Sequence, residues 1–229
     1  MALPLETPRL ILRRFRDEDL EPFLVYRNHP EVARYQSWQQ WTREQGLDFL
    51  RDQQRVNPGD LGRWFQYALE LKEGGALAGD CGICLKIERP RTAEIGFSLA
   101  PEHQRQGLAY ESVARIVEHA FRELGVVRVV ATVIQGNDRS AALLGRLGLS
   151  HGSPERVWFK GQWAEELRFS LEAEAGNTAL HARTAAVFPG LLGGGYRLLV
   201  IGSGGHVLAV RSILRGIKRV AERPGGRLG

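Results

Sequence analysis

Residues 94–112 read EIGFSLAPEHQRQGLAYES, and this stretch decides which fold the chain can adopt. It begins as an apolar, strand-like run and ends in a helix whose apolar stripe continues to Leu124. Between the two lies a polar segment rich in Gln, Arg and Gly, residues 103–109, which we call the corner. A strand that leads through such a corner directly into a helix indicates an α/β or α+β domain.

The corner offers the groups that bind an anion. Its residues supply successive backbone N–H groups where a helix begins, and a helix N-terminus carries unpaired N–H groups and the positive end of the dipole. Gly107 has no side chain and Ala109 a minimal one, so a diphosphate can approach the backbone. Arg105 adds charge and a forked set of donors. The corner therefore predicts a diphosphate site, although a simple strand-to-helix turn would also account for these residues.

The pattern on both sides of the corner predicts a mixed, mostly antiparallel central sheet with helices on both faces. Apolar periodicity, capping residues and glycine turns give the individual elements. We expect strands over 9–16, 63–71, 76–88, 93–100 and 126–134, a closing hairpin over 157–172 that turns at Gly161, and helices over 17–25, 31–38, 41–54, 107–124 and 137–148.

Composition places the chain among ordinary globular proteins. It has 229 residues, of which 43% are hydrophobic and 25% charged, enough for one buried core or one domain with an appendage. The longest apolar stretches, such as 126–134, are too short to span a bilayer, and the first ten residues lack the layout of a secretory signal. We therefore expect a cytoplasmic protein with no membrane partner.

Charge divides the chain near residue 175. Residues 176–229 contain eight basic residues and one acid, a net charge of +7, whereas the preceding 175 residues carry 23 basic and 25 acidic groups, a net charge of −2. Such asymmetry marks an appended tail and not a nucleic-acid-binding protein. We expect one domain over 1–175 and a basic, Gly-rich C-terminal extension over 176–229.

A second glycine-rich stretch lies in that extension. Residues 196–210, YRLLVIGSGGHVLAV, resemble the opening of a dinucleotide-binding fold, which would make the protein a nucleotide-dependent oxidoreductase. The third glycine of the motif is replaced by Val207, and only 24 residues follow Gly205. We expect an extension too short to form a cofactor site, either a fused neighbouring reading frame or a segment that packs on the domain or an oligomer partner.

The two cysteines, Cys81 and Cys84, stand at a spacing that invites a metal or redox interpretation. They lie in an expected strand, where residues three apart point to opposite faces, and no second Cys or His pair stands at ligand spacing nearby. We expect two buried thiols and no metal site.

The order and spacing of three motifs resemble the GNAT superfamily of N-acetyltransferases. QRQGLA at 104–109 matches the family signature Gln/Arg-x-x-Gly-x-Gly/Ala, and LETPRLILRRFRDEDL (5–20) and NDRSAALLGRLGL (137–149) stand around it. The arrangement is similar to the branch that acetylates N-terminal amines of ribosomal proteins, and it covers residues 5 to 173. The resemblance implies a GNAT-like acyl-CoA N-acyltransferase fold, acetyl-CoA as co-substrate, and direct acetyl transfer to a primary amine.

The resemblance also implies where coenzyme A binds. In the family the corner holds the pyrophosphate, here through Gln104, Arg105, Gln106, Gly107, Leu108 and Ala109. Backbone groups of Phe97, Ser98 and Leu99 would pair with the pantetheine arm like an added strand, and an N–H near Leu99 would polarise the thioester carbonyl. Asn137 would contact a pantetheine amide, although asparagine is also a good N-cap.

Two residues take catalytic roles by the same resemblance. Glu94 would remove the proton of the attacking ammonium through water, since an alkyl amine is mostly protonated at neutral pH. Its alternative is a surface ion pair with a neighbour such as Arg89 or Arg91. Ser140 would give a proton to the departing thiolate, or would only cap or pack in its helix.

The sequence says less about the acceptor of the acetyl group. Aromatic residues lie in the regions that form the acceptor side in relatives. They would line a pocket for a peptide N-terminus or would fill the core. These residues are Tyr35, Trp38, Trp41, Trp158 and Trp163. A protein N-terminal amine is the first expectation and a small amine, such as an aminoglycoside, the second, with Asp48, Asp52, Glu165 and Glu166 leaving that question open. A CoA-binding module without catalysis is the rival class. The sequence leaves a homodimer open.

Overall fold

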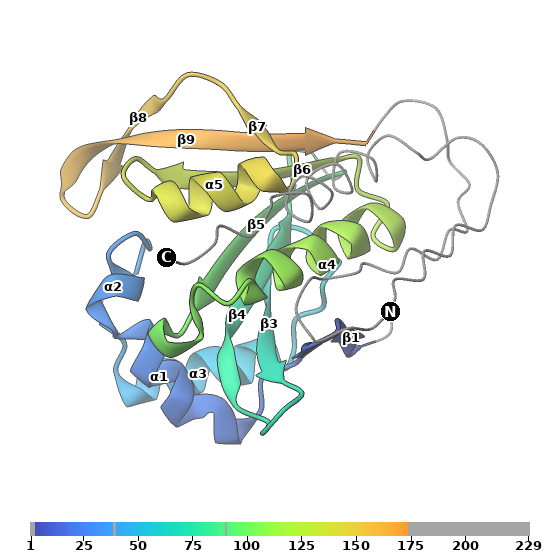
Figure 1. Ribbon diagram of the computed structural model, residues 1–229, viewed down its shortest axis with the longest axis vertical. Coiled ribbons are helices and arrows are strands. Elements are labelled where there is room, and N and C mark those ends of the chain that lie inside the picture. The colour runs from blue at the N-terminus through green and yellow to red at the C-terminus, as the bar shows by residue number, and fades with distance from the viewer. Residues whose placement is uncertain (1–2, 39, 90, 174–229) are drawn as a thin grey trace, which may run out of the picture.

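The computed structural model describes residues 3–38, 40–89 and 91–173 of the chain. The expected extension over 176–229, including the glycine-rich stretch at 196–210, lies outside the described residues. Their fold is a mixed α/β structure, as the sequence predicts, and its strands form one nine-stranded sheet (Figure 1).

The sheet is antiparallel except at one place. Its strands follow the order β1-β2-β3-β4-β5-β6-β9-β7, with β8 paired to β9. Among these strands the β5–β6 pair alone is parallel. The bounds are β1 Leu5–Glu6, β2 Leu10–Arg13, β3 Trp64–Leu71, β4 Leu77–Leu85, β5 Thr92–Leu99, β6 Arg128–Ile134, β7 Ser150–His151, β8 Glu155–Phe159 and β9 Gln162–Glu172.

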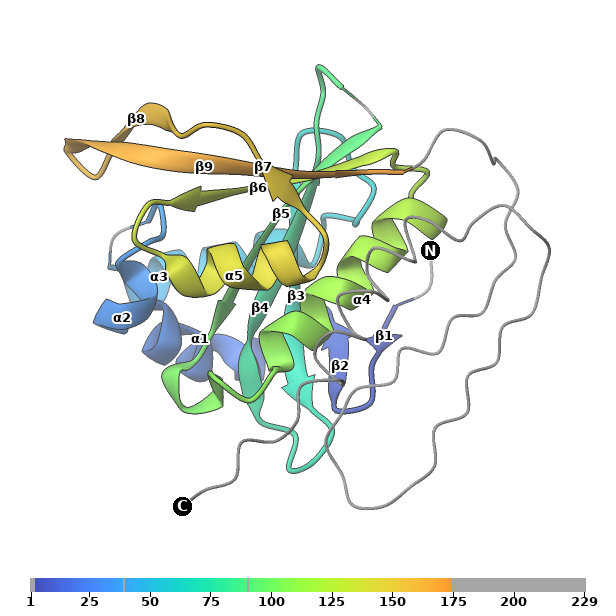
Figure 2. The ribbon, with the colours of Figure 1, turned by 45° about the horizontal axis from the view of Figure 1, so that its top comes forward.

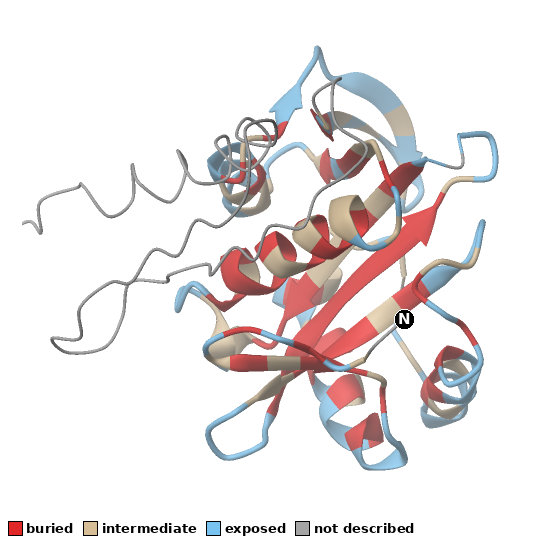
Figure 3. Cartoon of the chain, turned by 90° about the vertical axis from the view of Figure 1, so that its right-hand side faces the viewer, coloured by how far each residue is buried: buried red, intermediate tan, exposed pale blue. Residues whose placement is uncertain are grey.

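Two helices cover one face of this sheet. They are α4 (Leu108–Arg122) and α5 (Asp138–Arg146), which lie on the same side in Figures 1 and 2. The apolar stripe predicted for α4 is buried, and Val113, Ile116 and Val117 are completely inaccessible within the larger core cluster. Gly125 has φ +65°, the left-handed conformation expected of a residue that ends a helix. Figure 3 shows the buried side of α4 turned toward the strands.

The opposite face carries the N-terminal helices. They comprise the short 3₁₀ helix η1 (Asp17–Asp19), α1 (Leu20–Arg27), α2 (Pro30–Ala33) and α3 (Arg43–Gln53), and they surround a second apolar cluster. The capping of α3 follows the sequence, because Thr42 and Gln45 form a reciprocal capping box. A further 3₁₀ helix, η2 (Pro101–His103), precedes the corner.

The helix predicted over 31–38 is wrong in length, since α2 ends at Ala33. The side chains after it make long-range contacts in place of a helical stripe. The Trp38 indole donates to the carbonyl of Arg27 at 3.2 Å, and the Gln36 amide reaches Ser98 Oγ on β5 at 3.1 Å. These tertiary contacts override the local helix propensity.

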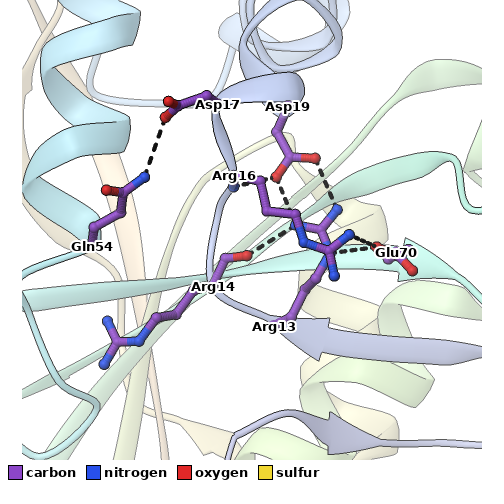
Figure 4. Close-up of polar contacts among 7 residues, drawn as sticks. All are labelled: Arg13, Arg14, Arg16, Asp17, Asp19, Gln54 and Glu70. Carbon is purple, nitrogen blue, oxygen red and sulfur yellow. Dashed lines mark hydrogen bonds and ion pairs between the residues drawn. The ribbon is translucent and has the colours of Figure 1, made fainter.

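A buried ion cluster joins β2, η1 and β3, as Figure 4 shows. The Arg13 guanidinium donates to both carboxylate oxygens of Asp19, at 2.6 and 2.9 Å, and also pairs with Glu70. The backbone N–H of Arg16 donates to Asp19 at 2.7 Å. Asp19 therefore fixes the point at which the chain leaves the sheet and enters the first helices.

The two cysteines are buried and unpaired, as expected. Cys81 packs in the core beneath α4, while Cys84, three residues further along β4, lies on the opposite face beside Glu94. Among the described residues, no helix has the length and apolarity needed to cross a membrane.

Candidate functional site

The parallel pair β5–β6 opens into a gap. The two strands are paired over three positions only, which end at Glu94 and Val130, whereas both strands continue beyond them. Figures 1 and 2 show that β5 and β6 diverge. The register thus leaves the rest of β5, beyond Glu94, without a ladder partner on the side of β6.

The backbone of β5 presents N–H groups to this gap, while the carbonyls of Phe97 and Leu99 accept hydrogen bonds from Gln36 and Gln104 at 3.4 and 3.0 Å. Lys86 N–H donates to the carbonyl of Thr92 and Ala100 N–H to that of Ala78, both at 2.9 Å. Because polar backbone groups alternate in direction along a strand, the even-numbered residues of β5 face β4. The N–H groups of Phe97 and Leu99 therefore point toward the gap, which is the geometry that an added pantetheine strand or an oxyanion requires.

Ser98 differs from its two neighbours. It is opposite Asp80 in the β4–β5 ladder, so its backbone faces β4 and not the gap. Its side chain is buried, and its hydroxyl accepts a hydrogen bond from Gln36. Of the three residues expected to hold the pantetheine arm, Ser98 is thus engaged through backbone and side chain, whereas Phe97 and Leu99 are engaged through their carbonyls.

The corner is built on two left-handed residues. Arg105 has φ +61° and Gly107 has φ +81°, and α4 begins directly after Gly107. The side chains of two expected ligands are used to fix it. Gln104 donates from Nε2 to the carbonyl of Leu99 at 3.0 Å, and Gln106 donates from Nε2 to the carbonyl of Glu102 at 2.8 Å. The corner therefore offers an anion chiefly its backbone N–H groups and the exposed Arg105 side chain.

Two carboxylates lie on the sheet face opposite α4. Glu94 forms an ion pair with Lys86. This is the pairing with a basic neighbour that was the alternative for Glu94, although the partner is Lys86 and not one of the two examples, Arg89 and Arg91. Burial raises the pKa of Glu166 on β9, and the nearby charge of Glu94 raises it further, while a hydrogen bond with Thr132 lowers it. The two carboxylates thus interact, and one of them is poised to hold a proton more readily than an ordinary glutamate.

Ser140 and Asn137 meet at the start of α5. Asn137 is the N-cap residue, and its Oδ1 accepts a hydrogen bond from Ser140 N–H at 3.3 Å. Both side chains are half-buried. The end of β6 places this helix start at the mouth of the gap, because only three residues separate Ile134 from α5.

The aromatic residues expected at the acceptor side are not brought together. Trp38 lies on the guanidinium of Arg27 at 3.9 Å, and Trp41 packs edge-on against Phe23 and Phe49 in the second apolar cluster. Tyr35 instead reaches the gap, where its hydroxyl donates to the carbonyl of Gly136 at 2.9 Å.

Trp158 and Trp163 form an exposed pair on the closing hairpin. Their rings contact each other edge to face, 63% and 58% exposed respectively. The turn of this hairpin touches the α2 region through Lys160, whose ammonium donates to the carbonyl of Ala33 at 2.8 Å. Lys160 and Tyr35 thus join the closing hairpin and the turn after β6 to the chain around α2.

Several residues at the site were not singled out from the sequence. Lys86 and Gln36 carry no local signal, because their partners lie on other strands. Tyr110, in the first turn of α4, is buried and its hydroxyl has no hydrogen-bond partner among the described residues. Arg9 and Glu111 fall inside quoted motifs, but only the structure places them against the corner.

Comparisons with known proteins agree with this geometry. Residues 9–150 match the family model described as the acetyltransferase (GNAT) domain. A Bacillus subtilis protein named as an uncharacterized N-acetyltransferase, YoaA, is 33% identical over 146 residues, which are 63% of this chain and 81% of that protein.

Two solved structures share the fold. The ribosomal-protein-S5-alanine acetyltransferase from Vibrio fischeri superposes with a TM-score of 0.66 at 19% identity, over 76% of this chain and 98% of that one. The spermidine N-acetyltransferase from Vibrio cholerae, solved with CoA and spermine, superposes with a TM-score of 0.62 at 18% identity, over 71% and 95%. At such identities the likeness concerns the fold alone.

Proposed function

The chain belongs to the GNAT family of acetyltransferases, and from this premise we propose that it transfers the acetyl group of acetyl-CoA directly to a primary amine, with a protein or peptide N-terminus as the acceptor. The observation that carries the proposal is the gap between β5 and β6, which opens beside the corner. Amides for a diphosphate and amides for a thioester thus stand on one continuous stretch, residues 97–109.

The residues around the gap divide the chemistry of the transfer. The corner would hold the diphosphate, and Phe97 and Leu99 N–H groups would pair with the pantetheine arm and its thioester oxygen. The amine nitrogen attacks the thioester carbon, and the C–S bond breaks as the C–N bond forms. Glu94 takes the ammonium proton, through water, and Ser140 returns a proton to the leaving thiolate. Asn137 would hold a pantetheine amide beside Ser140.

No nucleophilic side chain needs to carry the acetyl group in this scheme. Cys84 is near Glu94, but it is buried in the β4–β5 ladder, and burial raises its pKa. A thiol held in its neutral form is a poor nucleophile. Direct transfer between two substrates bound on either side of the gap accounts for the arrangement without it.

A second acceptor class has its own support. Glu94 and Glu166 place two interacting carboxylates on the sheet face opposite α4, which favours a cationic small amine such as a polyamine. The two solved relatives named above act on a ribosomal protein and on spermidine respectively, so this fold accommodates both classes.

Release of the CoA thiol tests the proposal. The full chain would be incubated with acetyl-CoA and, in separate arms, with peptides bearing free N-termini, with N-terminally blocked peptides containing lysine, and with polyamines or aminoglycosides. Release with free N-termini and not with blocked peptides would support the protein N-terminus. Release only with small amines would reassign the acceptor, and CoA binding without release in any arm would indicate a binding module.

A further inference from the structure

Glu111 is a carboxylate buried directly beneath the corner. It lies in the first turn of α4, and its side chain is completely inaccessible to solvent. Thr7 Oγ1 donates to it at 2.6 Å, Arg9 N–H at 2.8 Å, and Arg9 Nε at 2.7 Å. A buried charge is tolerated only when it is paired and hydrogen-bonded in this way.

Arg9 joins this buried carboxylate to the corner. One edge of its guanidinium binds Glu111, with Nη2 2.7 Å from Oε2, and Nη1 donates to the carbonyl of Gln106 at 2.8 Å. The same guanidinium borders Gly107, where a Cβ would lie 3.4 Å from Nη2. Arg9 therefore contacts the two residues that immediately precede α4, while 37% of its side chain stays exposed.

The corner needs such support because its conformation is costly. A non-glycine residue at positive φ, as Arg105 adopts, is strained and persists only where the surroundings fix it. Gln104 and Gln106 fix the corner from within, through the carbonyls of Leu99 and Glu102. Arg9 ties it to a different part of the chain, the turn between β1 and β2, and Arg139 of α5 adds a longer contact of 3.5 Å to Gln104 Oε1.

Charge makes the same contact important for a diphosphate. Glu111 stands at the helix end that would receive an anion, where an unpaired carboxylate would repel it. Arg9 neutralises this charge with a fixed, two-pronged contact that a single ammonium cannot reproduce.

We propose that Arg9 is a positioning residue for coenzyme A, held by Glu111 and Thr7 so that it fixes the corner with its amides directed at the diphosphate. This inference rests on the proposed function of the corner. It assigns the N-terminal strands, which lie outside the gap, a part in cofactor affinity and none in the chemical step.

The test compares two acetyl donors that differ in the diphosphate. Acetyl-CoA carries it, and S-acetylpantetheine does not. For Arg9→Gln we expect KM for acetyl-CoA and Kd for CoA to rise about tenfold, with kcat at saturation within about twofold of wild type. KM for S-acetylpantetheine should stay unchanged. Arg43→Gln, which removes an exposed arginine paired with Glu21, is the matched control and should alter neither donor.

Glu111→Gln separates positioning from simple charge. If Arg9 acted only through its charge, removal of the Glu111 carboxylate would strengthen CoA binding, because one negative charge near the diphosphate is lost. Positioning predicts the reverse, a weaker affinity for CoA, because Arg9 loses its anchor. Tighter CoA binding by Glu111→Gln would overturn the proposal.

Further outcomes keep the proposal distinct from the proposed function. Equal losses with both donors would show a general structural defect and overturn it, as would unchanged CoA affinity in Arg9→Gln. If that variant does not fold, Arg9→Lys carries the same comparison, since it keeps the charge and loses the fork. Absence of CoA binding by the wild-type chain in calorimetry would instead refute the function of the corner itself.

Discussion

At the scale of single residues, Glu94 is subject to two opposing influences. Lys86 forms an ion pair with it, while Glu166 places a second carboxylate nearby. An incoming ammonium would relieve the repulsion between the two carboxylates before it gives up its proton. We therefore propose that the pair of glutamates binds a protonated amine and then accepts its proton.

Replacement of Glu94 by Gln removes the proposed base and keeps the shape of the side chain. We expect kcat to fall by about 10²-fold or more, and the pH dependence of kcat to change, while Kd for CoA stays near wild type. Steady-state kinetics from pH 6 to 9 together with calorimetry would measure both. Glu88→Gln, at an exposed position beyond the end of β4, is the control.

The same kinetic measurements across pH on Glu166→Gln show which of the two carboxylates is the base. Glu94 is the base if its substitution alone removes the acidic limb of the profile, whereas a wild-type profile in Glu94→Gln with a lost limb in Glu166→Gln would transfer that role to Glu166.

A site residue could be predicted from the sequence when the pattern that identifies it lies within one short segment. The corner residues form one continuous motif, and Gly107 takes the left-handed conformation that only glycine adopts without strain. Lys86 could not be found in this way, and Glu166 could be named only as one of several acidic residues, because each comes close to Glu94 through the packing of the sheet. For Trp38 and Trp41 the sequence left a pocket and the core as alternatives, and both side chains pack in the second apolar cluster.

At the scale of elements, long periodic segments were predicted well and short ones were not. The stripe of α4 and the capping box of α3 depend on residues within one element, so both could be predicted from the sequence. The two-residue strands β1 and β7 were missed, because their assignment depends on pairing with β2 and β9. The α2 helix was overextended for the same reason, as contacts from Gln36 and Trp38 end it.

The junction of β2, η1 and β3 depends on one carboxylate. Asp19→Asn should lower the free energy of unfolding by about 2 kcal/mol, because Arg13 and Arg16 N–H lose a charged, buried acceptor. Urea denaturation measures it. Asp17→Asn is the matched control two residues away, since Asp17 is exposed and bonds only Gln54 among the contacts in Figure 4. It should lower the free energy of unfolding by no more than about 0.5 kcal/mol. Equal costs for the two variants would refute the assignment.

The packing of α4 on the sheet should depend on pH through His119. Burial lowers the pKa of this histidine, and the Glu123 carboxylate, 3.2 Å from Nδ1, offsets the effect only in part. The folded state then binds fewer protons than the unfolded state, so stability rises with pH across this window. It should decline as pH falls below about 6.5, the ordinary value for histidine, toward the lower pKa of the folded protein.

Urea unfolding at pH 7, 6 and 5 checks this dependence. His119→Gln should flatten the decline, whereas His151→Gln, at an exposed position on β7, should preserve it. An unchanged slope in His119→Gln would show that other groups cause the loss of stability.

At the scale of the whole molecule, the described residues form one folded unit around a single sheet. The last strand, β9, fills the interior position between β6 and β7, and Ala173 N–H donates to the carbonyl of Val127 at 2.7 Å directly after it. The corner, the gap, Glu94 and Ser140 all lie before this point. We therefore propose that residues 1–175 are the catalytic domain and that residues 176–229 are an extension outside its chemistry.

Deletion of residues 176–229 should leave kcat and KM for acetyl-CoA within about twofold of the full chain, because every residue assigned to the transfer remains. The deletion also removes a net charge of +7 and leaves a domain of −2. Charges at the edge of a binding site mainly change the association rate and its salt dependence. If the acceptor is charged, any effect of the extension should therefore appear in KM at low salt and not in kcat. Kinetics of both forms at two ionic strengths separate these cases. A large loss of kcat on deletion at either ionic strength would mean that the domain boundary near 175 is wrong and that the extension completes the active site.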